Sequence, residues 1–229
     1  MGKIDKSVPS RISTRDIIGA KQKFVLEQFK KDKYLKEKFY FTGGTALSLY
    51  YLQHRLSVDL DFFSEDKFDI NEVITRLNNW KKLSEFSFTQ TNIENTHIFL
   101  LEFPKNQTVK IDINFYPYKP LKKHRWIDGI KVNSQLDIAV NKMIAISQRT
   151  EVKDFVDLYF LLKEFTLWDL MDGVKVKFGF KTDPVFVASD FSKVDSFENM
   201  PKMIKPLTLK ELKDFFKEKA KQVSKQSVI

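Results

Sequence analysis

Two aspartates separated by a single residue are the first feature of the sequence that could carry chemistry. Asp59 and Asp61 lie in the segment Val58–Phe63, in which apolar and acidic residues alternate. On a β-strand this alternation places both carboxylates on one face, about 7 Å apart along the strand. Carboxylate oxygens are the ligands that Mg²⁺ prefers, and a bound Mg²⁺ could bridge them to a triphosphate.

A third carboxylate follows the same pattern farther along the chain. Asp112 alternates with apolar residues in the run Val109–Ile113. On a neighbouring strand it could complete a two-metal site, or it could take the proton from an attacking hydroxyl. Acidic side chains on an otherwise apolar strand are costly unless a cation compensates them. The three aspartates together therefore predict a metal site.

A glycine turn precedes the aspartates. Gly43 and Gly44 follow the apolar run 39–41 and are followed by a helical pattern over 46–52. Such a turn lets backbone N–H groups approach phosphate oxygens, and a helix N-terminus favours negative charge. A pair of glycines or an Asp-x-Asp sequence alone is more often a plain turn or a chance match. The order of strand, glycine turn, helix and aspartate strand is the stronger indication of phosphate chemistry.

The hydrophobic pattern predicts an N-terminal half that mixes strands and helices and a C-terminal half that is mostly helical. Further strands are predicted over 86–91, 97–103 and 109–115, and a helix runs from Asp69 to about Trp80. From Ser134 onward a 3.6-residue period predicts helices, and the capping box of Thr208 and Glu211 begins the last one. Residues 173–206 are predicted to be irregular because glycines and prolines punctuate them.

Composition excludes several classes of protein. The 229 residues contain no cysteine, which excludes disulfides and thiolate metal sites. The three histidines do not have the spacing of zinc ligands. We find no apolar run long enough to span a membrane and no secretory signal, and we expect a cytoplasmic protein. The net charge is +9, of which residues 201–229 hold eight lysines against three acids. That segment is predicted either to bind a polyanion or to form a solvated helix face.

Two groups of residues resemble the motifs of the AbiEii/AbiGii-type toxin nucleotidyltransferases, within the DNA polymerase β-like nucleotidyltransferase superfamily. The first group is FTGGTAL at 41–47 with RLSVDLDFF at 55–63; the second is DIAVNK at 137–142, Arg149 and KDFVDLY at 153–159. The resemblance implies an α+β fold. A nucleotidyltransferase-type mixed sheet with flanking helices, residues 1–133, would precede a mostly helical part, residues 134–229, that completes the active-site cleft.

The same resemblance assigns roles to individual residues. It implies that Lys142 and Asp157 act in catalysis beside the three aspartates, which are the predicted metal ligands Asp59, Asp61 and Asp112. The residues predicted to bind the nucleotide are Gly43, Gly44, Thr45, Arg55, Ser57, Lys142, Arg149, Lys153 and Asp154. Lys142 and Arg149 are seven residues apart, so they share one helix face that could hold a triphosphate. On spacing alone, Lys153 and Asp157 are equally well explained as an i,i+4 surface pair.

These observations predict a toxin of a toxin–antitoxin or abortive-infection system that depends on Mg²⁺ or Mn²⁺. It would transfer a nucleoside monophosphate from an NTP to an acceptor hydroxyl and release pyrophosphate. Family analogy favours RNA, especially a tRNA 3′ end, as acceptor, and a cognate antitoxin as partner. The alternatives are the same chemistry on a small-molecule or protein acceptor, and a non-catalytic nucleotide- or RNA-binding protein.

Two other features are interpreted as structural. His54, next to Arg55, is predicted to be a loop residue rather than a general base. Four tyrosines could stack on bases, but aromatic residues in strands and helices more often belong to the core: Tyr50, Tyr51, Tyr116 and Tyr118.

Overall fold

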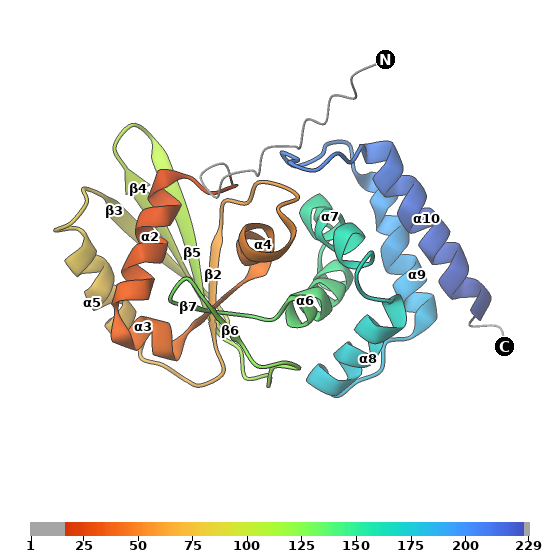
Figure 1. Ribbon diagram of the computed structural model, residues 1–229, viewed down its shortest axis with the longest axis horizontal. Coiled ribbons are helices and arrows are strands. Elements are labelled where there is room, and N and C mark those ends of the chain that lie inside the picture. Colours follow the sequence, from red (N-terminus) through yellow and green to blue (C-terminus); the bar gives the residue numbers. More distant parts are fainter. Residues whose placement is uncertain (1–16, 227–229) are drawn as a thin grey trace, which may run out of the picture.

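A computed structural model describes residues 17–226 of the protein (Figure 1). Within that range a mixed seven-stranded sheet has the strand order β3-β4-β5-β2-β1-β7-β6. The strands are β1 (Tyr40–Thr42), β2 (Leu60–Ser64), β3 (Ser87–Ile93), β4 (Thr96–Phe103), β5 (Gln107–Phe115), β6 (Arg125–Ile127) and β7 (Ile130–Val132). Pairs β1–β7 and β2–β5 are parallel and the remaining pairs are antiparallel. The predicted α+β class with a mixed sheet is confirmed.

The two central strands separate apolar from polar side chains by simple alternation. On β2, Leu60 and Phe62 are buried, and the Phe62 ring stacks on Phe29 of helix α2 with the ring centroids 3.6 Å apart. Asp61 projects from the opposite face, because successive side chains on a strand alternate between faces. Strand β5 repeats the pattern, with its buried apolar side chains on the same face as Phe62 and with Asp112 on the face of Asp61. One face of the sheet is thus core, and the other is available for a site.

Helices cover both faces of the sheet. Figure 1 shows α2 (Ala20–Lys31), α3 (Lys33–Lys38) and α5 (Ile70–Trp80) on one side. On the other side lie α4 (Gly43–Leu47), which continues as a π-helical turn over Ser48–Leu52, and α6 (Gln135–Gln148). The capping box predicted at Asp69 is replaced by a simpler cap, in which the Asp69 carboxylate accepts from the backbone N–H of Asn71.

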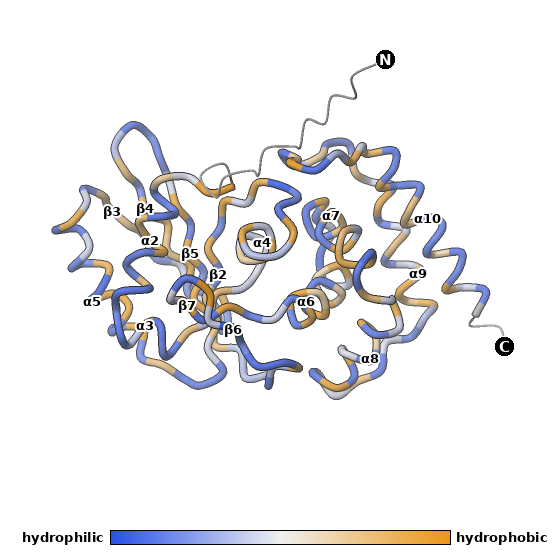
Figure 2. Tube along the Cα trace, in the orientation of Figure 1, coloured by the Kyte–Doolittle hydropathy of each residue, from blue (hydrophilic) through white to orange (hydrophobic). Residues whose placement is uncertain are grey.

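The C-terminal half stacks further helices against α6. They are α7 (Val152–Leu161), α8 (Leu167–Phe178), α9 (Pro184–Ser192) and α10 (Leu209–Gln226), with a 3₁₀ turn over Lys193–Ser196. Phe155, Phe197, Phe191 and Phe216 join the helices in an aromatic cluster whose neighbouring rings lie 5.0–5.1 Å apart. Figure 2 shows α10 as largely hydrophilic, whereas α6 and α7 in the middle of the molecule are more apolar.

Two local predictions need correction, and one element was not predicted. The aspartate strand begins at Leu60 rather than Val58, and Val58 is exposed instead of facing the core. Residues 173–206 are not irregular throughout, because α8 continues to Phe178 and α9 follows. Helix α9 begins with Asp183 as N-cap and Pro184 in the first turn. Proline is tolerated there because the backbone N–H that it lacks would have no hydrogen-bond partner within the helix. The hairpin of β6 and β7 was not predicted.

Two distant segments tie the halves together. The backbone N–H groups of Ile204 and Lys205 donate to the carbonyl of His54 at 2.8 and 3.0 Å, and Leu56 N–H donates to Lys202 at 2.8 Å. The loop after α4 is therefore held by the segment that leads into α10. The predicted division between residues 133 and 134 falls between β7 and α6 and stays a prediction. Among the described helices, none combines the length and apolarity that a membrane crossing needs.

Candidate active site

A pocket of about 350 Å³ lies between the polar face of the sheet and helix α6. Asp61 and Asp112 are register partners on the parallel strands β2 and β5, so their side chains leave the same face side by side. Asp59 borders the same pocket from the residue before β2. The pocket is lined by Thr42, Gly43, Gly44, Arg55, Ser57, Asp59, Asp61, Phe63, Thr96, Lys110, Asp112, Asn114, Tyr116, Ile138, Asn141, Lys142, Ile144, Ala145, Gln148, Arg149 and Lys153.

The carboxylates on the pocket floor repel one another. Burial, followed by the neighbouring carboxylates of Asp112 and Asp59, raises the pKa of Asp61 to about 7. Burial also raises the pKa of Asp112, although the ammonium of Lys110, 2.6 Å from Asp112 Oδ2, opposes the rise. Asp112 Oδ1 is buried and has no hydrogen-bond partner in the described part of the chain. The floor therefore holds negative charge and an acceptor atom that its own side chains leave uncompensated.

This floor fits a hard divalent cation, although it is not a closed metal cage. Within residues 17–226, no three acidic or histidine side chains are already gathered tightly enough to enclose a metal ion. Asp61 and Asp112 nevertheless present carboxylate oxygens from paired positions, and the unpartnered Oδ1 of Asp112 is an atom that a cation would satisfy. Asp59, Asp61 and Asp112 are accordingly the side chains that could hold Mg²⁺ or Mn²⁺.

The two glycines of the turn leave room for side chains of the site, because a Cβ at either position would collide with one of them. Gly43 has a φ of +71°, and a Cβ there would lie 2.0 Å from Asp61 Oδ2. A Cβ at Gly44 would lie 2.4 Å from Arg55 Nη2. Real Cβ atoms do not approach other atoms so closely, so glycine is required at both positions for Asp61 and Arg55 to reach the turn. Both glycines line the pocket, as does Ser57.

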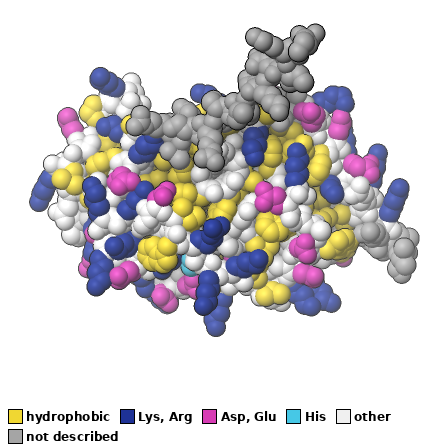
Figure 3. Space-filling model, in the orientation of Figure 1, with side chains coloured by type: hydrophobic (Ala, Val, Ile, Leu, Met, Phe, Trp, Pro, Cys, Tyr) yellow, Lys and Arg dark blue, Asp and Glu magenta, His cyan; other side chains and the backbone are white. Residues whose placement is uncertain are grey.

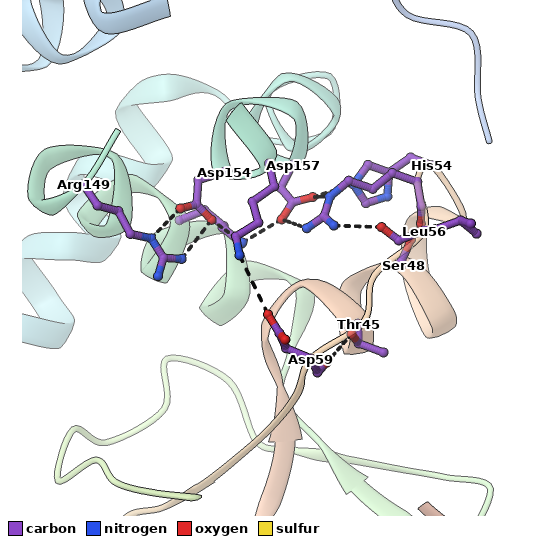
Figure 4. Close-up of polar contacts among 11 residues, drawn as sticks. Thr45, Ser48, His54, Leu56, Asp59, Arg149, Asp154 and Asp157 are labelled. Carbon is purple, nitrogen blue, oxygen red and sulfur yellow. Dashed lines mark hydrogen bonds and ion pairs between the residues drawn. The ribbon is translucent and has the colours of Figure 1, made fainter. Parts of the chain in front are cut away.

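Two buried hydroxyls fasten the turn to the segment that carries the aspartates. The hydroxyl of Thr45 donates to the backbone carbonyl of Asp59, and the hydroxyl of Ser48 donates to the carbonyl of Arg55 (Figure 4). Thr45 is fully buried and lines no part of the pocket. The hydroxyl of Thr45 is thus used to position Asp59, and the predicted role of Thr45 in binding phosphate stays a prediction.

A buried ion network forms the helical wall behind the pocket (Figure 4). Asp157 on α7 accepts from Arg55 Nε at 2.6 Å and from Arg55 Nη2 at 2.8 Å. The same carboxylate contacts His54 Nε2 at 2.7 Å and Lys142 Nζ at 2.6 Å. These four residues come from the loop after α4, from α6 and from α7, so one carboxylate joins three parts of the fold.

Asp154 extends the network toward the surface. Lys142 Nζ lies 2.6 Å from Asp154 Oδ1, and Arg149 Nε donates to Asp154 Oδ2 at 2.7 Å. We use the name ion network for these residues together: His54, Arg55, Lys142, Arg149, Asp154 and Asp157. Two carboxylates are surrounded by three permanent cations, so the network carries a net positive charge beside the pocket.

The electrostatics of the network are opposite to those of the floor. Lys142 and Arg55, with hydrogen bonds from His54 and Arg55, overcome burial and hold the pKa of Asp157 well below its usual range. Lys142 and Arg149 likewise lower the pKa of Asp154 against the effect of burial. Burial lowers the pKa of His54, and its contact with Asp157 only partly offsets this, so His54 is neutral near pH 7.

The basic side chains at the rim of the pocket, Lys153 and Arg149, are partly exposed. The side chain of Lys153 is 40% exposed, and its Nζ lies 3.8 Å from Asp59 Oδ2, too far for a tight pair. The side chain of Arg149 is 54% exposed even though it binds Asp154. Both can therefore reach an anion in the pocket without first leaving a buried position.

The structure thus divides the predicted site residues into two groups. Apart from Thr45, Asp154 and Asp157, all of them line the pocket. Asp154 and Asp157 are fully buried behind it, which excludes the alternative of an i,i+4 surface pair. The predicted basic stripe is also modified, because Lys142 is enclosed by two carboxylates rather than free to bind phosphate alone.

Several residues of the pocket and of the ion network were not predicted from the sequence. Lys110 and Asn114 lie two residues on either side of Asp112, so strand alternation could have placed them on the same face. His54, interpreted as a simple loop residue, is completely buried and bound to Asp157, 103 positions away. No local sequence pattern predicts a contact between residues so far apart in the chain. Asn141, which accepts a hydrogen bond from the Tyr116 hydroxyl at 3.1 Å, is a further pocket residue that was not predicted.

Known proteins resemble this chain over most of its length. The family model "Nucleotidyl transferase AbiEii toxin, Type IV TA system" matches residues 25–227. An uncharacterized protein of Aquifex aeolicus is 34% identical over 193 residues, which cover 80% of this chain and 87% of that protein.

Solved structures share the fold at lower sequence identity. JHP933 from Helicobacter pylori superposes with a TM-score of 0.58 at 22% identity, covering 90% of this chain and 91% of that one. The nucleotidyltransferase toxin MenT4 from Mycobacterium tuberculosis superposes with a TM-score of 0.53 at 14% identity, covering 88% and 82%. The fold is that of the nucleotidyltransferases.

Proposed function

The chain belongs to the AbiEii family of nucleotidyl transferase toxins of type IV toxin–antitoxin systems, and from this we propose that it transfers a nucleoside monophosphate from an NTP to an RNA hydroxyl. The observation that carries the proposal is the juxtaposition of Asp61 and Asp112 in a pocket with basic groups at its rim. A metal-bound triphosphate suits this arrangement, because its metal ion would contact the uncompensated carboxylates and its phosphates would contact the exposed cations.

The charges of the site support a requirement for a divalent cation. The cationic side chains are Arg55, Lys110, Lys142, Arg149 and Lys153, and the carboxylates are Asp59, Asp61, Asp112, Asp154 and Asp157. Five of each leave the site close to neutral when all are ionised. An NTP carries about four negative charges, which these side chains do not neutralise, so Mg²⁺ is expected to bind with it. We assign Asp59, Asp61 and Asp112 to the metal.

The chain's own residues would then divide the work. A bound Mg²⁺ or Mn²⁺ would supply Lewis-acid polarisation of the phosphate. Lys153 and Arg149 would hold the triphosphate and stabilise the charge that develops on the pyrophosphate leaving group. Asp112 Oδ1, which lacks a partner, would either ligate the metal or accept the proton of the attacking hydroxyl. Lys142 and Asp157 would act by fixing the helical wall against the turn at Gly43 and Gly44.

RNA is proposed as acceptor, with a tRNA 3′ end as the leading candidate by family analogy and a cognate antitoxin as the biological partner. Basic side chains are spread over the face seen in Figure 3 and interspersed with acids, so this face offers no single basic patch. On α10 the predicted polyanion-binding role stays a prediction. Lys210 pairs there with Asp214, and Lys217 pairs with Asp195, so part of its charge is compensated.

A transfer assay tests the proposal directly. Purified protein, Mg²⁺ and each α-labelled NTP in turn would be incubated with total bacterial RNA, with Asp61→Asn as the inactive control. We expect label in a tRNA-sized band that depends on Asp61 and on the divalent cation. Label on a protein would show a different acceptor. NTP binding without any transfer would support the non-catalytic alternative and contradict the proposal.

A further inference from the structure

The pocket continues outward as a row of aromatic side chains. From the pocket to the surface they are Phe63, Tyr116, Tyr118, Phe178 and Phe180, and we call this row the aromatic ladder. Successive ring centroids lie 4.9, 4.9, 4.8 and 6.2 Å apart. Phe63 and Tyr116 line the pocket itself. A continuous aromatic path therefore connects the carboxylate floor with the outside of the molecule.

The outer members of the ladder are exposed, unlike the aromatic residues of the core. Tyr118 is 39% exposed and Phe180 is 50% exposed, whereas the rings of the cluster around Phe155 and Phe216 are buried. Leaving large aromatic rings in water forgoes the stabilisation that full burial of such a side chain provides. Contiguous exposed apolar surface of this kind commonly marks a binding site.

The ladder is held rigidly by one buried carboxylate. Asp137 on α6 accepts from the backbone N–H groups of Leu121 and Lys122 at 2.9 and 3.1 Å, and Lys177 Nζ lies 2.7 Å from it. The loop after β5 and the end of α8 are thus fixed to the same helix. Gly179, with a φ of +80°, then turns the chain so that Phe180 lies beside Phe178. Rings ordered in advance lose little entropy when a ligand stacks on them.

The charge around the ladder identifies the class of ligand. The segments 116–123 and 173–182 contain no acidic residue. Their exposed charged residues are Lys119, Lys122, Lys123, Lys175 and Lys181, and within the described chain none of these side chains pairs with a carboxylate. Exposed aromatic rings interleaved with unpaired lysines are the arrangement that binds single-stranded nucleic acid, because bases stack while phosphates contact the cations.

We propose that the aromatic ladder binds the unpaired 3′ end of a polynucleotide acceptor and leads its terminal hydroxyl to the carboxylate floor. This inference rests on the proposed nucleotidyl transfer, whose acceptor it specifies as a single-stranded end. The position of the ladder supports it, since Tyr116 directly follows β5, four residues beyond Asp112, and lines the same pocket. The triphosphate would occupy the opposite end of the pocket, beside Lys153 and Arg149.

Binding and transfer should be measured separately so that the two proposals can fail independently. The probe for binding is a 5′-fluorescein-labelled, unstructured oligoribonucleotide of about ten nucleotides, within the usual site size of stacking platforms. Its anisotropy would be followed at low salt without NTP. We expect the double variant Tyr118→Ala/Phe180→Ala to bind at least about tenfold more weakly than the wild type. Tyr118→Phe should restore most of the affinity of the Tyr118→Ala variant, because the ring remains.

Phe186→Ala is the matched control, since Phe186 is an aromatic residue of α9 that is 71% exposed. It should bind like the wild type, and a duplex of the same sequence with blunt ends should bind more weakly than the single strand. In the transfer assay the double variant should raise the KM for RNA and leave the KM for NTP unchanged. Oligonucleotide binding without transfer by the wild type would contradict the proposed function while supporting the ladder.

Three results would overturn the ladder proposal. The first is equal oligonucleotide affinity of the wild type and the double variant. The second is an increase in the KM for NTP alone, which would assign the rings to the base of the nucleotide. The third is transfer to RNA by the double variant with an unchanged KM for RNA, which would place the acceptor on another surface even though the proposed function holds.

Discussion

On the pocket floor Asp61 and Asp112 stand side by side with one ammonium, that of Lys110, bound to Asp112. In the ion network Asp154 and Asp157 are contacted by three permanent cations between them. Burial acts on all four carboxyl groups, yet the pKa values of Asp61 and Asp112 are raised while those of Asp154 and Asp157 are lowered. The difference lies in the number of cations that reach each carboxylate.

This contrast separates two uses of a buried acid. A network whose carboxylates are already paired stabilises the arrangement of the loop after α4 against α6 and α7, and leaves neither carboxylate free to bind a cation from outside. A floor with raised pKa values and an unpartnered Oδ1 on Asp112 is completed only by something from outside. Substitutions on the two sides should accordingly affect different measurements.

The largest difference is expected for Asp61→Asn. Because Asp61 is assigned to the metal, its loss should lower the rate of transfer by about 10³-fold or more. The same change removes a repelled, buried charge, so at pH 8 without metal the free energy of unfolding should rise, on the order of 2 kcal/mol. Initial rates and urea unfolding measure the two effects. A variant that stays active, or that is clearly less stable, would contradict the assignment of the floor.

Asp157→Asn should instead lower the free energy of unfolding. Removing this charge leaves Arg55 and Lys142 buried with one compensating carboxylate, which typically costs about 3–5 kcal/mol. Urea or thermal unfolding would measure the loss. Asp172→Asn is the control, because Asp172 is exposed on α8 and its substitution should change stability by less than about 0.5 kcal/mol. If both variants were equally stable, the network would not be the structural element described here.

The sequence predicts the floor much better than the network. Strand alternation alone places Asp61 and Asp112 on polar faces, and the glycine turn before them is visible as a pattern. The start of the strand was misjudged because Val58 fits the alternation although it is exposed. Periodicity describes residues that are near one another in the chain, and the floor is largely built from two such local patterns.

The network depends on contacts that no local pattern encodes. Asp157 meets His54 and Arg55 across more than a hundred residues, and the pairing exists only once the helices have packed. The family resemblance pointed to Arg55 and Asp157 but not to their partnership. Tyr118 and Phe178 of the ladder likewise meet only because Asp137 joins their segments. Long-range packing, rather than residue type, is therefore what sequence reasoning lacked.

A smaller effect is expected where the two regions meet at the rim. Lys153 lies 3.8 Å from Asp59 and is free to turn toward a triphosphate. Lys153→Gln should raise the KM for NTP about tenfold, the equivalent of one charge-assisted hydrogen bond, without reducing stability. Lys67→Gln, at an exposed position away from the pocket, is the control. An unchanged KM in both variants would remove Lys153 from the nucleotide site.

The smallest expected effect concerns the pH dependence that His54 gives to the network. Burial beside Arg55 and Lys142 lowers the pKa of His54 below 6.5, so on acidification the unfolded chain takes up this proton before the folded protein does. The contribution of His54 to stability should therefore fall as the pH drops below about 6.5, whereas Asp61, whose pKa is raised to about 7, contributes in the opposite direction. The paired carboxylates of Asp154 and Asp157 add a loss only at lower pH, below about 4.

His54→Gln tests this contribution, because glutamine can still donate to Asp157 but does not titrate. Between pH 6.5 and pH 5 the variant should lose about 1 kcal/mol less stability than the wild type, measured by urea unfolding across that range. The pKa values of His97 and His124 are also lowered, so His97→Gln serves as the comparison and should flatten the curve less, since His97 is far less buried. Equal curves for His54→Gln and the wild type would mean that His54 gains its proton as readily in the folded protein as in the unfolded chain. The network would then tolerate a further positive charge, and its contrast with the floor would rest on the carboxylates alone.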